Sequence, residues 1–173
     1  GYQIGEKSKF AKMALWETAT RTPLIIKPPK SQSKGKQVSN RPVSLLDLYP
    51  TLVKMCGLPE NPATQGNDIT PLLNKPDAYW QHAAVTTYGP NNHAVKTEQY
   101  RYIRYEDGSE ELYDHQHDKD EWKNLATHPA YSEIKAQLKA KLPKDNAQWS
   151  PVSYYDGNDY FKNLTNEAQS KKL

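Results

Sequence analysis

Apolar and polar side chains alternate along the middle of the chain, which is the period of a β-strand. Four stretches carry this alternation, at residues 83–88, 93–97, 100–105 and 111–114. Asp107-Gly108, between the last two stretches, is a strong hairpin signal. The pattern therefore predicts four consecutive antiparallel strands.

Two other segments repeat their apolar residues at helical spacing. The first begins at Ser44, a good N-cap, with Asp47 placed to return a capping contact and Gly57 as a stop. The second runs from residue 125 to 142 and ends at Pro143. The apolar positions are Leu45, Leu48, Leu52 and Met55 in the first, and Ile134, Leu138 and Leu142 in the second. We expect the second helix to cover the sheet.

The short apolar run at residues 23–27, Pro-Leu-Ile-Ile-Lys, is typical of a buried strand in a parallel or mixed sheet. The chain offers few other runs of this kind, so most of that sheet is expected elsewhere. The predicted fold class is α/β, in three parts. Residues 1–78 end an α/β domain, residues 79–143 form a small α+β subdomain of four antiparallel strands and a helix, and residues 144–173 form an extended tail.

Composition changes this picture only slightly. Hydrophobic residues make up 36% of the chain and the mean hydropathy is −0.95, which is polar for a free-standing domain. Twelve Tyr and four Trp against two Phe favour wet interfaces and sugar-binding surfaces. The net charge of +3 is spread along the chain, unlike the basic stripe of a nucleic-acid-binding protein, so we expect no nucleic-acid partner. No apolar run is long enough to span a membrane.

Cys56 is the one cysteine, so no disulfide can form within the chain. It lies at the end of the first helical pattern, and no activating group is near it in sequence. We therefore interpret Cys56 as a buried structural thiol.

Several motifs in order resemble the formylglycine-dependent sulfatases of the alkaline phosphatase superfamily. They are Gly1-Tyr2-Gln3-Ile4-Gly5-Glu6 with Lys12, Val43-Ser44-Leu45-Leu46-Asp47 with Pro50-Thr51-Leu52, Gln65-Gly66 with Pro71-Leu72-Leu73, Tyr100-Arg101-Tyr102-Ile103, Glu111-Leu112-Tyr113-Asp114 and Asn124-Leu125-Ala126. Within the family, the Gly-Glu loop and Asn92-His93-Ala94-Val95 are most similar to the branch of iduronate-2-sulfatase, choline-sulfatase and bacterial polysaccharide sulfatases. The resemblance covers the chain to about residue 143.

The resemblance implies that this is the C-terminal part of a sulfatase. The family's formylglycine motif, Cys/Ser-x-Pro/Ala-x-Arg, does not occur in the sequence. The Asp-His or Asp-Asn pair that binds calcium in the family precedes the first glycine, so we expect the calcium ligands upstream of Gly1. No metal ligand is assigned within the chain, and the expected partner is the N-terminal sulfatase portion.

Four residues are candidates for the site. The resemblance places Lys12 where the family has a lysine that contacts sulfate, so Lys12 is the catalytic candidate. Asn92 and His93 follow a Gly-Pro-Asn loop at a strand edge and could contact substrate, and Tyr2 could flank it. For each, the alternative is an ordinary structural or surface residue.

Other polar residues are interpreted as structural. The histidines and carboxylates of residues 114–120 could suggest a metal cluster, but a solvated loop is favoured. Glu6, Glu17 and Arg21 are expected in a buried ion pair or as loop anchors, and Lys7 and Lys9 on the surface.

The predicted function is hydrolysis of sulfate esters on a sulfated carbohydrate, by the complete enzyme and not by this part alone. The family implies a periplasmic or secreted location. Two alternatives stay open: a non-catalytic relic that binds a glycan or a partner, and a phosphate or phosphonate monoester hydrolase of the same superfamily.

Overall fold

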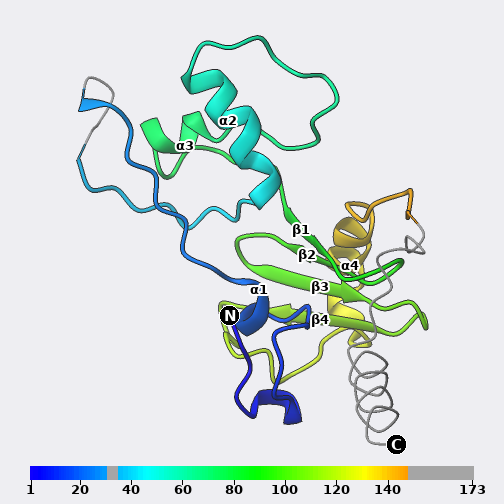
Figure 1. Cartoon of the computed structure of the whole chain (residues 1–173). Helices are drawn as coiled ribbons and strands as arrows, with labels where there is room; N and C mark the ends of the chain where they lie inside the picture. Colours follow the sequence, from blue (N-terminus) through cyan, green and yellow to red (C-terminus); the bar gives the residue numbers. More distant parts are fainter. Residues whose placement is uncertain (31–34, 148–173) are drawn as a thin grey trace, which may run out of the picture.

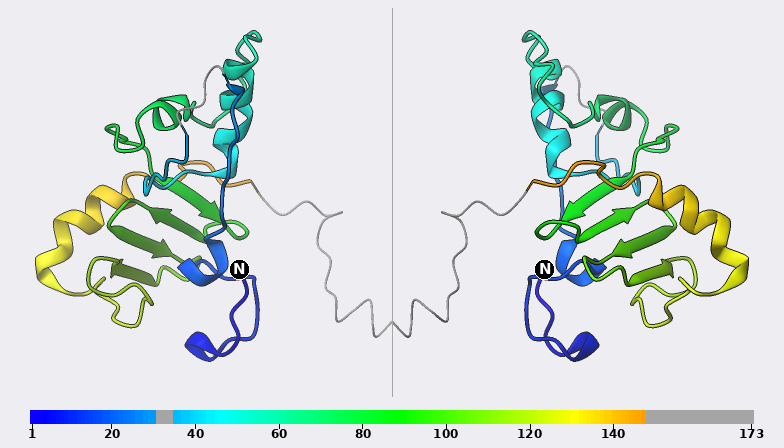
Figure 2. Two further views of the ribbon diagram at one scale, coloured as in Figure 1. Left: turned by 90° about the vertical axis from the view of Figure 1, so that its left-hand side faces the viewer. Right: turned by 90° about the vertical axis from the view of Figure 1, so that its right-hand side faces the viewer.

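A computed structural model describes residues 1–30 and 35–147. Its centre is one four-stranded sheet, which lies between helix α4 on one face and the N-terminal segment on the other (Figures 1 and 2). Helices α2 and α3 form a separate group above the sheet (Figure 1). The chain is therefore of the predicted α/β class, with the four antiparallel strands and the covering helix in the expected order.

The strands pair as consecutive antiparallel neighbours, in the order β1-β2-β3-β4. They are β1 Ala84–Thr87, β2 His93–Lys96, β3 Tyr100–Arg104 and β4 Glu110–Asp114. Gly108, with φ of 83°, supplies the left-handed conformation that the β3–β4 turn needs, and Asp107 Oδ1 accepts hydrogen bonds from the Ser109 backbone and hydroxyl. The alternation and the Asp-Gly signal thus predicted these strands correctly.

One face of the sheet packs against α4 Ser132–Lys139. Val95 of β2 pairs with Tyr102 of β3, and Tyr102 pairs with Leu112 of β4. These three residues form one buried row across the sheet. Leu138 and Leu142 close that cluster from the helical side. The predicted helix over 125–142 is shorter than expected, because Pro129 begins a short 3₁₀ turn, Pro129–Tyr131, and α4 starts only after it.

The opposite face carries Ala94, Ile103 and Tyr113, and Leu15 of the N-terminal segment packs on them. Because both faces of the sheet are covered, side chains that point inward on this second face must be apolar or must have a hydrogen-bond or ion-pair partner. Arg101 is 2% exposed and lies on this second face, where it needs a charged partner.

The free edge of β4 is covered by the Asn124-Leu125 segment. Asn124 Oδ1 accepts a hydrogen bond from the Leu112 backbone at 3.0 Å, and the Leu125 backbone donates to the Leu112 carbonyl at 2.8 Å. The Asn-Leu motif of the sequence therefore satisfies backbone groups that an edge strand would leave unpaired.

Asp47 joins α2 Leu48–Met55 to the turn before α3 Thr70–Asn74. Its carboxylate is 4% exposed and accepts from the Ser44 backbone at 2.7 Å, completing the predicted capping box with the Ser44 side chain. The same carboxylate accepts from the Asn67 backbone at 2.7 Å. Thr51 adds a second link, since its hydroxyl donates to the Asp47 carbonyl and accepts from the Ile69 backbone.

The predicted strand at residues 23–27 is wrong for the described chain. These residues carry no strand, and Leu24 and Ile25 are 41% and 89% exposed. A lone parallel strand has no backbone partners without a neighbour, and the described residues supply none here.

The apolar stripe predicted for the first helix is only partly covered. Leu48 and Met55 are half-buried, whereas Leu45 and Leu52 are 72% and 56% exposed, and the fully buried residues of α2 are Thr51 and Val53. Cys56 follows at the C-cap and is exposed, not buried as predicted, because the surface around it is uncovered.

Two further predictions stay without a test. The aromatic tail beyond residue 147 lies outside the described residues, and the domain boundaries at 78 and 143 stay a prediction. Within the described ranges, no helix combines the length and apolar character that crossing a membrane requires.

Candidate functional site

The N-terminal segment forms a closed loop before it reaches the sheet. The Gln3 backbone donates to the Ala11 carbonyl at 2.9 Å, and a short 3₁₀ turn, Glu6–Ser8, lies at its tip. Glu6 anchors the loop as expected, because its carboxylate accepts from the Ile4 backbone at 2.7 Å. Lys12 lies on the returning arm of this loop.

Lys7 fastens the loop to the sheet and is not a free surface lysine as the sequence suggested. Its Nζ donates to the Tyr113 hydroxyl at 3.1 Å and also to the Glu121 carbonyl. The ammonium also lies 4.6 Å from the centre of the Tyr113 ring and 5.1 Å from that of Trp16.

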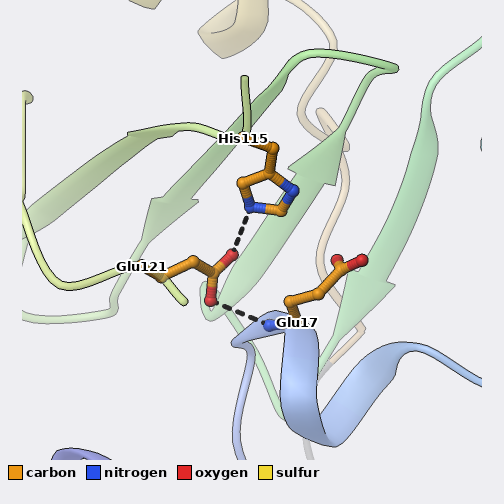
Figure 3. Close-up of side chains that lie close together, drawn as sticks. All are labelled: Glu17, His115 and Glu121. Carbon is orange, nitrogen blue, oxygen red and sulfur yellow. Dashed lines mark hydrogen bonds and ion pairs between the residues drawn. The ribbon is translucent and has the colours of Figure 1, made fainter. Parts of the chain in front are cut away.

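Arg101 of β3 holds the end of the same segment. It forms ion pairs with Glu17 of α1 Glu17–Thr20 and with Glu121, whose Oε1 lies 2.7 Å from Nε, and it donates to the Leu15 carbonyl at 2.9 Å. Glu121 also accepts from the Glu17 backbone at 2.9 Å and contacts His115 Nε2 at 2.8 Å (Figure 3). We call Glu17, Arg101, His115 and Glu121 the ionic cluster.

Burial raises the pKa of Glu17, but the charge and hydrogen bond of Arg101 outweigh burial and hold that pKa below its ordinary value. Burial lowers the pKa of Lys96, on the same face of the sheet, to about 8, against the opposing attraction of Glu17. Glu17 is therefore ionised at neutral pH, as an ion-pair partner and not as a proton donor.

Glu17, His115 and Glu121 bring three potential metal-ligand atoms within 4.8 Å of one another. Arg101 already forms ion pairs with both carboxylates, and an imidazole is a poor ligand for calcium, which prefers oxygen. The group does not fit a calcium ion. It confirms the expectation that Glu17 belongs to a buried ion pair.

Two acidic residues, Asp114 at the end of β4 and Asp118 beyond it, bind backbone groups of the loop that follows the strand. Asp118 accepts from the Trp122 and Lys123 backbones, and Asp114 accepts from the Gln116 backbone and from His117 Nδ1. These contacts agree with a structural loop.

Lys12 and Tyr2 are both exposed on the N-terminal loop. The Tyr2 hydroxyl donates to the Phe10 carbonyl at 3.2 Å, which joins the two arms of the loop just before Lys12. The structure thus gives Lys12 a fixed backbone and a side chain open to solvent. Its catalytic role stays a prediction.

His93 is 1% exposed, and both ring nitrogens are occupied. Nδ1 lies 2.8 Å from the Thr87 hydroxyl, and Nε2 lies 2.6 Å from the Asn146 side-chain oxygen. A substrate contact would require one of these bonds to break. The role of His93 in substrate binding stays a prediction.

Asn92 and the N-terminal segment meet at an open hollow of about 630 Å³, whose lining includes Lys9 and Trp16. The Asn92 side chain donates to the Pro90 carbonyl and accepts from the Glu106 backbone, so it fixes the loop beside the hollow. Three carboxylates, Glu106, Asp107 and Glu111, also line it. They make it a poor match for a sulfate group. Of the predicted site residues, Asn92 lines this hollow, whereas His93 and Lys12 do not.

Sequence reasoning missed Lys7, Arg101 and Glu121. A signal was present for Arg101, because the alternation that directs Ile103 inward also directs Arg101 inward. A charged residue on an inward face needs a buried counter-charge. The identity of its partners, far away in sequence, was not readable.

Comparison with known proteins agrees with this arrangement. Residues 5–148 match the family described as N-sulphoglucosamine sulphohydrolase, C-terminal. A sulfatase of Formosa agariphila is 44% identical over 161 residues, which are 93% of this chain and 31% of that protein. An ulvan-active sulfatase of the same organism is 27% identical over 148 residues, which are 80% of this chain and 29% of that protein.

Among solved structures, that of Ps i-CgsB superimposes with a TM-score of 0.52 at 18% identity, over 70% of this chain and 28% of that one. This likeness concerns the fold. The chain spans 31% and 29% of the lengths of the two Formosa relatives, so it corresponds to one part of a sulfatase. On the match of residues 5–148, the chain belongs to the family of N-sulphoglucosamine sulphohydrolase C-terminal domains.

Proposed function

We propose that this chain is the C-terminal part of an enzyme that hydrolyses sulfate esters. The observation that carries the proposal is the family match over residues 5–148. The 44% identity to a Formosa sulfatase supports it, because that similarity extends over 93% of the chain.

The substrate class that we propose is a sulfated carbohydrate. One relative is described as ulvan-active and the family is described by a sulphoglucosamine substrate. Exposed aromatic residues and a net charge of +3 suit a polar, anionic sugar chain.

In this proposal Lys12 contacts the sulfate group. A flexible ammonium can offset negative charge that develops as the ester bond breaks. The contacts of Lys7 hold the tip of the loop and the ionic cluster holds the segment that follows it, so the Lys12 backbone is positioned before substrate arrives. We place the formylglycine nucleophile and the calcium ligands of the family in the N-terminal portion, upstream of Gly1.

The same proposal assigns a partner to the exposed leucines. Leu45, Leu46 and Leu52 form an uncovered apolar surface around α2, and Ile25 adds a second exposed position. We propose that the N-terminal portion of the enzyme covers them. A periplasmic or secreted location follows from the family and belongs to the proposal.

The test uses the complete protein that contains this chain. Purified enzyme should release sulfate from an aryl sulfate and from a sulfated oligosaccharide, and should act far less on the matching aryl phosphate and phosphonate. Preferred hydrolysis of the phosphorus esters would support the alternative hydrolase. Binding of the oligosaccharide without any hydrolysis would support a non-catalytic glycan-binding protein.

A further inference from the structure

A second hollow lies on another part of the surface, where the chain enters β1 and leaves α4. Its volume is about 660 Å³, and its lining includes Tyr79, Trp80, His82 and Lys141. Ala83 and Val85, which line it, pack against the buried cluster that Leu138 and Leu142 complete, so this side of the hollow rests on the core between the sheet and α4.

The aromatic side of this hollow is held in place. The Trp80 indole N–H donates to the Pro42 carbonyl at 3.0 Å, and its ring meets the His82 ring edge-on with centroids 4.7 Å apart. The adjacent Tyr79 side chain is 86% exposed. The Trp80 ring is therefore positioned at little cost in side-chain entropy, and the Tyr79 ring beside it presents an open apolar face with a polar edge.

The charge of the hollow distinguishes it from the first one. None of the described residues that line it is acidic, and Lys141 contributes a positive charge, with its Nζ 3.4 Å from the Gln81 carbonyl. Asn67 and Gln81 add amide groups at the rim. The first hollow has three carboxylates against one lysine, so a sulfate or carboxylate group is favoured only in the second.

We propose that this second hollow binds an anionic pyranose residue of a polysaccharide. The apolar C–H face of the sugar would lie on Tyr79, and Lys141 would pair with a sulfate or carboxylate substituent. The site would hold the sugar chain on the enzyme and take no part in bond cleavage. Its polysaccharide ligand rests on the substrate class proposed above, but binding is measured independently of hydrolysis.

The test is affinity electrophoresis of the complete protein through gels that contain one polysaccharide each. The probes are carrageenan, which is sulfated, alginate, which carries only carboxylates, and neutral dextran. Tyr79→Ala and Lys141→Ala should each weaken retention by carrageenan by about 3- to 10-fold, the loss expected for one aromatic contact or one partly exposed ion pair. Trp80→Ala is avoided because its indole supports the loop.

Matched controls remove the same groups elsewhere on the surface. Trp122→Ala removes an aromatic ring that is 65% exposed, and Lys119→Ala removes an exposed lysine. Both should migrate like the wild type. If the alginate gel also retains the protein, and both substitutions weaken that retention, the ligand is any anionic sugar. If only the carrageenan gel retains the protein, the sulfate group is what the site recognises.

The proposal would be overturned if the carrageenan gel retained Tyr79→Ala and Lys141→Ala as strongly as the wild type. It would also be overturned if the control variants lost retention to the same extent. Aryl sulfatase activity of the two variants should stay at the wild-type level. If the complete protein hydrolysed no sulfate ester while Tyr79→Ala still lost retention, the proposed function would fail and this site would stand.

Discussion

Two lysines of the N-terminal loop, Lys7 and Lys12, have opposite surroundings. Lys7 is held between a tyrosine hydroxyl, a backbone carbonyl and two aromatic rings. Lys12 is exposed. Because Lys7 anchors the loop, Lys12 is free to contact a ligand without weakening the fold.

Replacing Lys12 separates its two possible roles. In the complete enzyme, Lys12→Ala should lower kcat/KM for sulfate esters by about 10²-fold or more, the loss typical of a charge contact to the transition state. The thermal unfolding midpoint should not change. Lys9→Ala, on the same loop, is the control and should keep most of the activity. Full turnover by Lys12→Ala would return Lys12 to an ordinary surface residue.

His93 calls for a test of stability before one of specificity. His93→Ala removes the ring partner of the Thr87 hydroxyl and one of the two contacts of the Asn146 side-chain oxygen, which should cost about 1–3 kcal/mol in the free energy of unfolding. Denaturant unfolding measures this loss of stability. The control is His117→Ala, which removes a histidine side chain that is 78% exposed. An unchanged stability with a selective loss on a sulfated glycan would instead support His93 as a substrate contact.

At the scale of elements, the ionic cluster joins α1 and the loop after β4 to strand β3. Its members are mostly buried: the side chains of Arg101 and Glu121 are 3% and 2% exposed. Such a cluster adds little net stability when complete, but becomes costly when one charge is left unpaired.

Arg101→Met should therefore destabilise the protein strongly, by about 3–5 kcal/mol, because Glu17 and Glu121 would lose the buried guanidinium that pairs with both of them. Arg104→Met on the same strand is the matched control and should cost much less, since the ion pairs of the cluster stay intact. Denaturant unfolding of both variants gives the comparison. Equal, small losses of stability in both variants would show that other positive groups stabilise the two carboxylates when Arg101 is absent.

The predictability of each element depends on how local its signal is. The four strands were predicted closely because alternation and the Asp-Gly turn are encoded by neighbours in sequence. The capping box at Ser44 was equally local. The helix near the C-terminus was predicted too long, because Leu125 covers a strand edge as a loop and Pro129 starts a separate turn. Helical spacing could not distinguish these uses of the same apolar residues.

The candidate site was less predictable than the fold. The resemblance located the Lys12 loop, but Glu17 and Arg101 stand 84 residues apart, and no periodic pattern links them. The buried strand at 23–27 and the buried Cys56 were wrong for a related reason. A sequence pattern indicates which apolar side chains favour burial, but not whether the described residues supply a surface that buries them.

At the scale of the whole molecule, the main feature is apolar surface without a cover. Leu45, Leu46, Leu52 and Ile25 are each more than half exposed. Large apolar side chains that form an exposed patch mark contacts with other protein surface.

This surface can be tested in both contexts. Leu52→Lys should raise the solubility of the isolated chain, because it breaks the apolar patch. In the complete enzyme the same change should lower the unfolding midpoint, since it would bury a charge at the proposed contact. Val38→Lys, at another apolar position that is 81% exposed, is the control. Unchanged stability of the complete enzyme would show that the N-terminal portion does not cover α2.

The attachment of the N-terminal loop also sets an order of events during synthesis. Lys7 and its Glu121 partner are 114 residues apart in sequence. At translation rates of about 5–20 residues per second, the ribosome needs roughly 6–23 s to make that interval. During this time the Lys12 loop has no sheet to attach to, and its final geometry waits for strands that emerge later. The Lys12 loop therefore gains its anchor only after the four strands and the loop up to Glu121 have been made, and before helix α4 follows.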